Sequence, residues 1–141
     1  MILACAPAAS LAAGSQHRPV MTPTPPAAPA QPPVTAAPYD GQLLKLSELM
    51  GSVAFLADLC PDVHDSAQNG EIWRQKAQSL LETEATETHL KTLLAGAYNR
   101  GYLGFEVNYR VCTDAARMSF ARNISAISAI ANDLTRKYSG N

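Results

Sequence analysis

Residues 99–113, NRGYLGFEVNYRVCT, decide how this chain folds. The segment combines glycines, aromatic residues, arginines and a cysteine, and its flanks have the periodicity of a helix. On a helix, its aromatic residues and Tyr98 are spaced by four, three and four positions and therefore form one stripe. A second stripe beside it consists of small residues: Ala97, Gly101 and Gly104.

Glycine within a helix costs up to about 1 kcal/mol relative to alanine, so Gly101 and Gly104 need a local reason. The simplest reason is the close approach of another backbone. The first of the expected helices offers a matching small face at Ser47, Gly51 and Ala54. We therefore expect the first and third helices to cross tightly at Gly51, Gly101 and Gly104. A kink at the two glycines of the third helix is the rival explanation.

Helical periodicity predicts four helices and no strand. The first begins at Asp40 as N-cap, and its apolar positions step by three and four from Leu43 to Cys60, after which Pro61 ends it. The second helix is expected from about residue 71 to 84. Its inward-facing residues are predicted to be Ile72, Trp73, Ala77, Leu80 and Leu81.

The third helix is expected over residues 87–111, and Thr113 is expected to cap the fourth. The fourth helix has a heptad-like apolar seam that begins at Phe120 and ends at Tyr138. With short connections between them, these segments predict an all-α fold, a four-helix up-and-down bundle.

Cys60 and Cys112 are expected to form a disulfide. In an up-and-down bundle the first and third helices end at the same pole, so the two sulfur atoms can meet there. Closing about fifty residues should stabilise the fold by roughly 4 kcal/mol in the chain-entropy model. Two buried free thiols are the alternative. His64 and Asp65 make only a weak case for zinc, so no metal site is expected.

The N-terminal part differs in composition from the rest. Residues 1–17 are expected to be the remnant of a signal peptide, truncated at its start in this sequence, with a cleavage zone near LAAGSQ. Residues 18–38 hold most of the prolines and predict a disordered Pro/Ala-rich linker, which leaves residues 39–141 as the helical domain. The lipobox-like ILAC would make Cys5 a lipid anchor, but no full apolar stretch precedes it.

Composition excludes several classes of function. The net charge is −1 and only 16% of the residues are charged, which argues against a nucleic-acid partner. No segment supplies the ~20 apolar residues of a transmembrane helix. No zinc-protease, nucleophile-elbow or phosphate-loop motif occurs, so neither catalytic residues nor a cofactor are expected.

Polar and aromatic residues beside the predicted core suggest a binding patch. Its members are Trp73, Arg74, Asn99, Arg100, Tyr102 and Tyr109. One interpretation is structural: the arginines pair with Glu71, Glu84 or Glu106. The other is a site for a small anion or a peptide, with the arginines as bidentate donors and the tyrosine hydroxyls fixing orientation.

Four segments carry a family resemblance: LSELMGSVAFLADLC, EIWRQKAQSLLETE, NRGYLGFEVNYRVCT and TRKYSGN. Together they resemble a family of small exported alphaproteobacterial proteins of unknown function, over residues 39–141. The most specific part is NRGY at 99–102, followed by Phe105, Tyr109 and Cys112. The resemblance implies periplasmic export and matching positions for the two cysteines. It implies no activity, and the N-terminus departs from the intact signal peptide of such proteins.

These observations favour a periplasmic, non-catalytic binding or structural module of the cell envelope. Its partner would be a periplasmic protein or a cell-wall component. The alternative is a small enzyme, or an enzyme activator, that acts on the cell wall through Arg100 and Tyr102.

Overall fold

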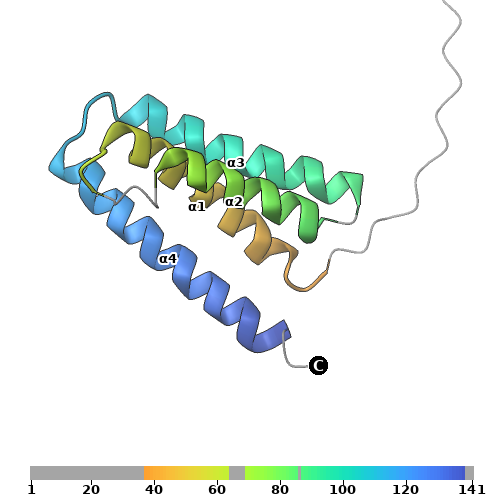
Figure 1. Cartoon of the computed structure of the whole chain (residues 1–141). Coiled ribbons are helices and arrows are strands. Elements are labelled where there is room, and N and C mark those ends of the chain that lie inside the picture. Colours follow the sequence, from red (N-terminus) through yellow and green to blue (C-terminus); the bar gives the residue numbers. More distant parts are fainter. Residues whose placement is uncertain (1–36, 64–68, 86, 139–141) are drawn as a thin grey trace, which may run out of the picture. The chain divides into compact units, whose positions relative to one another are not determined.

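The computed structural model describes residues 37–63, 69–85 and 87–138 (Figure 1). Several predicted features lie outside the described residues: the signal remnant 1–17 with Cys5, nearly all of the linker 18–38, and the loop residues His64 and Asp65.

Four helices make up most of the described chain: α1 (Asp40–Leu59), α2 (Gly70–Thr83), α3 (Thr88–Asn108) and α4 (Asp114–Tyr138). They alternate in direction, as Figure 1 shows, and no strand occurs in the described ranges. The predicted all-α, four-helix, up-and-down bundle is therefore confirmed. None of these described helices combines the length and the hydropathy that crossing a membrane requires.

Side-chain caps define the starts of two helices. The side chain of Asn69 accepts a hydrogen bond of 3.0 Å from the backbone N–H of Ile72, which starts α2. Thr113 caps α4 as predicted, since its hydroxyl accepts a bond of 3.2 Å from the backbone N–H of Ala116. These bonds satisfy N–H groups that have no partner within the helix.

Two helix ends differ from the prediction. Asp40 is the first residue of α1 rather than its cap, and its carboxylate accepts a bond of 2.8 Å from the backbone N–H of Ala37. Helix α3 ends at Asn108 rather than 111, because the backbone of Tyr109 is extended. This turn directs the hydroxyl of Tyr109 to Ser119 of α4, at 2.9 Å.

Helices α1 and α3 cross at two glycines. A Cβ on Gly51 would overlap the carbonyl group of Tyr98, and a Cβ on Gly101 would overlap that of Glu48. Each glycine therefore lets the backbone of the opposite helix approach closely. The expected contact does not extend to Gly104, which is exposed and has no atom within 4 Å of an added Cβ.

Both helices also place small side chains at this crossing. Ala54 and Ala97 are fully buried, and the hydroxyl of Ser47 donates a buried hydrogen bond of 2.8 Å to the carbonyl oxygen of Leu94. A hydroxyl can lie at such an interface only because this bond satisfies it.

The crossing determines where the other helices lie. In a square bundle α1 and α3 are diagonal neighbours, but here they make the most extensive helix contact. Helices α2 and α4 each pack mainly on α1, and they lie on different sides of it (Figure 1). Because α1 and α3 approach each other closely across one diagonal of the bundle, α2 and α4 are held apart across the other and make no extensive contact.

Helix α4 is attached to α1 chiefly at one pole. Cys60 and Cys112 form the predicted disulfide, which joins the end of α1 to the α3–α4 connection. The side chain of Arg117 pairs with Asp62 at 2.9 Å beside it. At the opposite pole, among the described residues, a partly buried hydrogen bond from the amide of Gln42 to Asp133 links α1 to α4.

Candidate functional site

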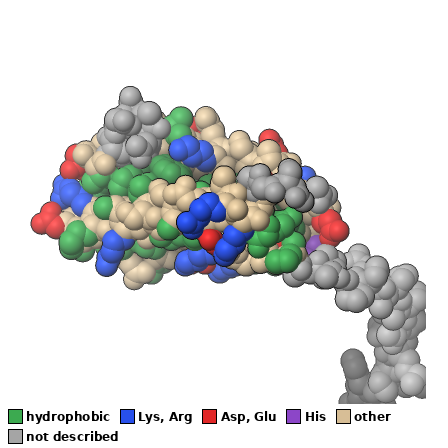
Figure 2. Space-filling view, turned by 90° about the horizontal axis from the view of Figure 1, so that it is seen from below, with side chains coloured by type: hydrophobic (Ala, Val, Ile, Leu, Met, Phe, Trp, Pro, Cys, Tyr) green, Lys and Arg blue, Asp and Glu red, His purple; other side chains and the backbone are tan. Residues whose placement is uncertain are grey.

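A shallow groove lies between α2 and α4, where these two helices are held apart, and α1 forms its floor. Two adjoining cavities of about 500 and 570 Å³ lie along it, and Leu80 lines both. Figure 2 shows the molecule from the side of α4, where apolar side chains form a band along the surface. Grooves of this kind, apolar with a few polar groups, are typical of binding surfaces.

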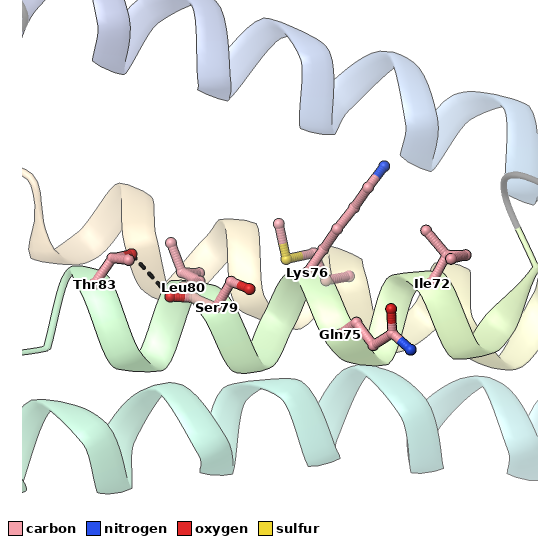
Figure 3. A pocket seen from close by; sticks show the side chains of 7 residues that line it. Ile72, Gln75, Lys76, Ser79, Leu80 and Thr83 are labelled. Carbon is pink, nitrogen blue, oxygen red and sulfur yellow. Dashed lines mark hydrogen bonds between the residues drawn. The ribbon is translucent and has the colours of Figure 1, made fainter.

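The first cavity runs along α2 from Ile72 to its last residue, Thr83, and α4 lies across from it in Figure 3. Met50 of α1 forms its floor, and Ile72 and Thr83 stand at its two ends, with Leu80 next to Thr83. Lys76 extends away from α2 toward α4 in this view, and its ammonium nitrogen lies 4.3 Å from the centroid of the Trp73 ring.

The second cavity continues toward the opposite pole. Leu43 and Leu46 form the floor, Leu80 and Glu84 belong to the α2 side, and the α4 side consists of Ala131, Leu134, Thr135 and Tyr138. Tyr39 closes this end, with its ring packed edge-on against Tyr138 at 5.2 Å between centroids. The two rings place aromatic surface and hydroxyl groups at the mouth of the groove.

Two of the hydroxyl donors in the walls of the groove are already satisfied within their own helices. Thr83 donates to the carbonyl oxygen of Ser79 at 2.8 Å, and Thr135 donates to that of Ala131 at 2.9 Å (the first is dashed in Figure 3). Covering these two threonines would therefore leave neither hydroxyl donor unpaired. This lowers the desolvation cost of an apolar occupant.

Two opposite charges line the groove, Lys76 midway along α2 and Glu84 immediately after its end. Neither has an ion-pair partner within the described ranges. The groove is thus polarised along its length, positive toward the disulfide pole and negative toward the Tyr39 end.

The structure divides the predicted binding patch. Arg74 and Asn99 meet in a separate cavity of about 230 Å³ between α2 and α3, together with Tyr98. Trp73 is buried in the core instead, and the ring of Tyr102 packs edge-on against Phe55 of α1. The other two members are apart from this cavity: Tyr109 bonds to α4, and Arg100 is exposed on α3.

The guanidinium of Arg74 is already engaged by two carboxylates. Its Nη1 pairs with Asp58 at 2.8 Å and its Nε with Glu71 at 2.9 Å. These hydrogen bonds raise the pKa of Arg74 and lower that of Glu71. Because the three groups together carry a net charge of −1, the cluster does not attract a small anion. The structural interpretation of Arg74 fits the geometry better, and Glu71 is one of the partners anticipated for it.

Two buried polar atoms near this cluster have no hydrogen-bond partner, the hydroxyl oxygen of Tyr98 and the indole nitrogen of Trp73. Burial raises the pKa of the Tyr98 hydroxyl, and the nearby charge of Arg74 partly opposes this rise. The hydroxyl of Tyr98 is therefore protonated near neutral pH.

The disulfide lies beside one carboxylate. Asp62 is close enough to Cys60 and Cys112 for the three to resemble a metal-ligand set. The sulfur atoms are bonded to each other, however, so they are not available as thiolate ligands. Asp62 instead pairs with Arg117 and raises the pKa of its guanidinium.

Sequence reasoning did not identify the groove between α2 and α4, although one signal of it was present. The apolar face predicted for α2 is wider than one neighbouring helix requires. Trp73 and Ala77 are buried by α1, whereas Ile72 and Leu80 remain half-exposed along the groove. Leu81, on the other flank, lines the cavity with Arg74.

Comparison with known proteins places the chain in a family. A family model described as "Protein of unknown function (DUF2385)" matches residues 38–138, so the chain belongs to this family. The match covers the four helices and supports the expected resemblance to an uncharacterised family. No curated protein and no solved structure matches the chain.

Proposed function

We propose that this member of the DUF2385 family is an exported, non-catalytic binding module of the bacterial periplasm or cell envelope. Its partner is a periplasmic protein that docks in the groove between α2 and α4. The observation that carries the proposal is the groove itself: half-exposed apolar side chains of α2 and α4, such as Leu80 and Leu134, above a floor of buried α1 residues.

Export is supported by the disulfide and by the composition of the N-terminus. Cys60 and Cys112 are bonded, and disulfides persist mainly in oxidising compartments. Residues 1–17 have the apolar, Ala-rich character of a signal peptide's later part.

A non-catalytic role is supported by the chemistry of the groove. Its lining includes only two charged residues, Lys76 and Glu84, which stand at different cavities. Acid–base or nucleophilic catalysis needs such groups to converge on one point. Steady turnover by the pure protein on murein would contradict this part of the proposal.

The binding surface can be tested with two neighbouring residues of α2. Ser79 lines the groove, whereas Gln78 lines the cavity on the side of α3, and both are exposed. Ser79→Arg would fill the groove, and Gln78→Arg places the same side chain one residue away. After cross-linking in cells, we expect the partner to co-purify with the wild type and with Gln78→Arg but not with Ser79→Arg. Loss with Gln78→Arg alone would move the site to the α2–α3 face, and recovery with both variants would exclude both surfaces.

The location is tested separately. Fractionation of cells, followed by alkylation without reductant, should find the protein in the periplasm with Cys60 and Cys112 unmodified. A cytoplasmic protein whose two thiols are both alkylated would contradict export.

A further inference from the structure

We propose that the occupant of the groove between α2 and α4 is one amphipathic α-helix of the partner protein, running antiparallel to both α2 and α4. This inference rests on the proposed function and specifies the partner's shape, orientation and charge.

The dimensions of the groove suit a helix. Helix α2 has 14 residues, which corresponds to about 21 Å at 1.5 Å per residue. The floor consists of Leu43, Leu46 and Met50, which are spaced by three and four on α1 and are already buried, and the half-exposed Leu80 and Leu134 rise from the flanking helices. A helix whose apolar residues recur every three or four positions would lie along this surface as a fifth helix of the bundle.

The alternating directions of the helices in the bundle determine which way the partner helix runs. Helices α2 and α4 both start at the disulfide pole and run the same way, as Figure 1 shows. An inserted helix of the opposite direction is antiparallel to both of its neighbours, as adjacent helices are in an up-and-down bundle. The helix dipoles then also oppose each other, which is the favourable arrangement.

The charges of the groove favour the same direction independently. An antiparallel helix passes Glu84 before it reaches Lys76, so the residues nearer its C-terminus, where the partial charge is negative, lie on the side of Lys76. Its N-terminal part, which carries partial positive charge, then lies beside Glu84. The partner helix should accordingly carry an acidic residue toward its C-terminus and a basic residue toward its N-terminus. Such complementarity contributes orientation and specificity more than raw affinity.

The experiment uses two designed peptides of about 14 residues with leucine at helical spacing. The forward peptide has lysine near its N-terminus and glutamate near its C-terminus, and the reverse peptide exchanges them. Both are acetylated and amidated, and their dissociation constants for the full chain are measured by calorimetry. We expect the forward peptide to bind about three- to tenfold more tightly, as two partly exposed ion pairs allow.

The decisive variant is Lys76→Glu combined with Glu84→Lys, which should invert the preference for the same two peptides. Because both peptides are compared on both proteins, any difference in their own helicity cancels. Arg100→Glu, a charge reversal on α3, serves as the control and should leave the preference unchanged.

Each other outcome contradicts the inference in its own way. If the two peptides bind equally well and the charge exchange does not alter this, the proposed orientation of the helix is wrong. No binding of either peptide overturns the helical occupant, whereas loss of a cross-linked partner with Ser79→Arg would still uphold the binding function. A second copy as the occupant would appear as a dimer in sedimentation that both peptides fail to disrupt.

Discussion

Gly51 and Gly101 differ from Gly104 in what occupies the space around them. At the first two, the backbone of the opposite helix fills the place of a side chain, and at Gly104 that place is open. The same residue type within one bundle therefore has two energetic roles. At Gly51 and Gly101 the glycine permits a close helix crossing, whereas at Gly104 it only reduces helix propensity.

Alanine substitutions should separate these roles. We expect Gly51→Ala and Gly101→Ala each to lower the free energy of unfolding by about 1–3 kcal/mol or more, because the Cβ meets backbone that cannot rotate away. Gly104→Ala should instead raise it by about 0.5–1 kcal/mol, since alanine favours the helix. Urea denaturation of the three variants measures both effects. A similar change in all three would mean that the crossing does not depend on glycine.

At the scale of the element, α4 depends on few contacts at its C-terminal end. The amide of Gln42 donates a hydrogen bond of 2.7 Å to Asp133, and Lys137 pairs with the same carboxylate at 2.7 Å. The hydrogen bonds from Lys137 and then from Gln42 lower the pKa of Asp133 below its ordinary value of 3.8. Protonation of this one group therefore weakens the link between α1 and α4.

A pH titration should reveal this link. Because the pKa of Asp133 is lower in the folded state, its contribution is fully present above about 3.8 and is lost as the pH falls through the lowered value. We expect the wild type to be slightly more stable than Asp133→Asn near pH 7, and this difference to shrink as the pH falls below 3.8 and to vanish only below the lowered pKa of Asp133. Thermal denaturation of both proteins across this range measures it. A difference that persists in acid would assign the effect to something other than the carboxylate charge.

The disulfide has the larger effect on α4. It joins residues 52 positions apart, so Cys60→Ala combined with Cys112→Ala should lower the free energy of unfolding by roughly 4 kcal/mol in the chain-entropy model. Reduction of the wild type should reproduce this loss, and equilibrium denaturation with and without reductant measures both. A loss below about 1 kcal/mol would show that the unfolded chain is already restricted without the bond.

The sequence predicted the elements better than their arrangement. Helix periodicity and the cap at Thr113 are local properties, and the structure contains both. The end of α3 was misjudged because the turn at Tyr109 satisfies a distant hydroxyl on Ser119. The groove was not predicted, because the separation of α2 and α4 depends on how closely α1 and α3 approach each other. The members of the predicted patch lie in different surroundings, with Arg74 lining a cavity and Arg100 exposed on α3, because periodicity predicts which residues share a helix face but not what packs against that face.

At the scale of the whole molecule, the packing is uneven. The larger core cluster extends over α1, α2 and α4 and includes Cys60 near the disulfide. The second cluster has only three buried members, Leu43, Ala85 and Leu94, and lies toward the pole where the chain enters α1. Helix α1 contributes to both and contacts every other helix, whereas α4 packs mainly on α1.

The rate of amide hydrogen exchange should be lowest where the packing is most extensive, because local opening requires less free energy where fewer buried contacts are broken. We expect the amides of α1 around Val53 to exchange most slowly, and those of α4 near Leu134 about ten- to a hundredfold faster. Reduction of the disulfide should speed exchange in the first turns of α4 but leave α2 nearly unchanged, which provides an internal control. Exchange measured by mass spectrometry on peptides from each helix tests the order. Equal rates in all four helices would mean that the bundle opens only as one unit, and α4 would then have no independent freedom to widen the groove for a partner.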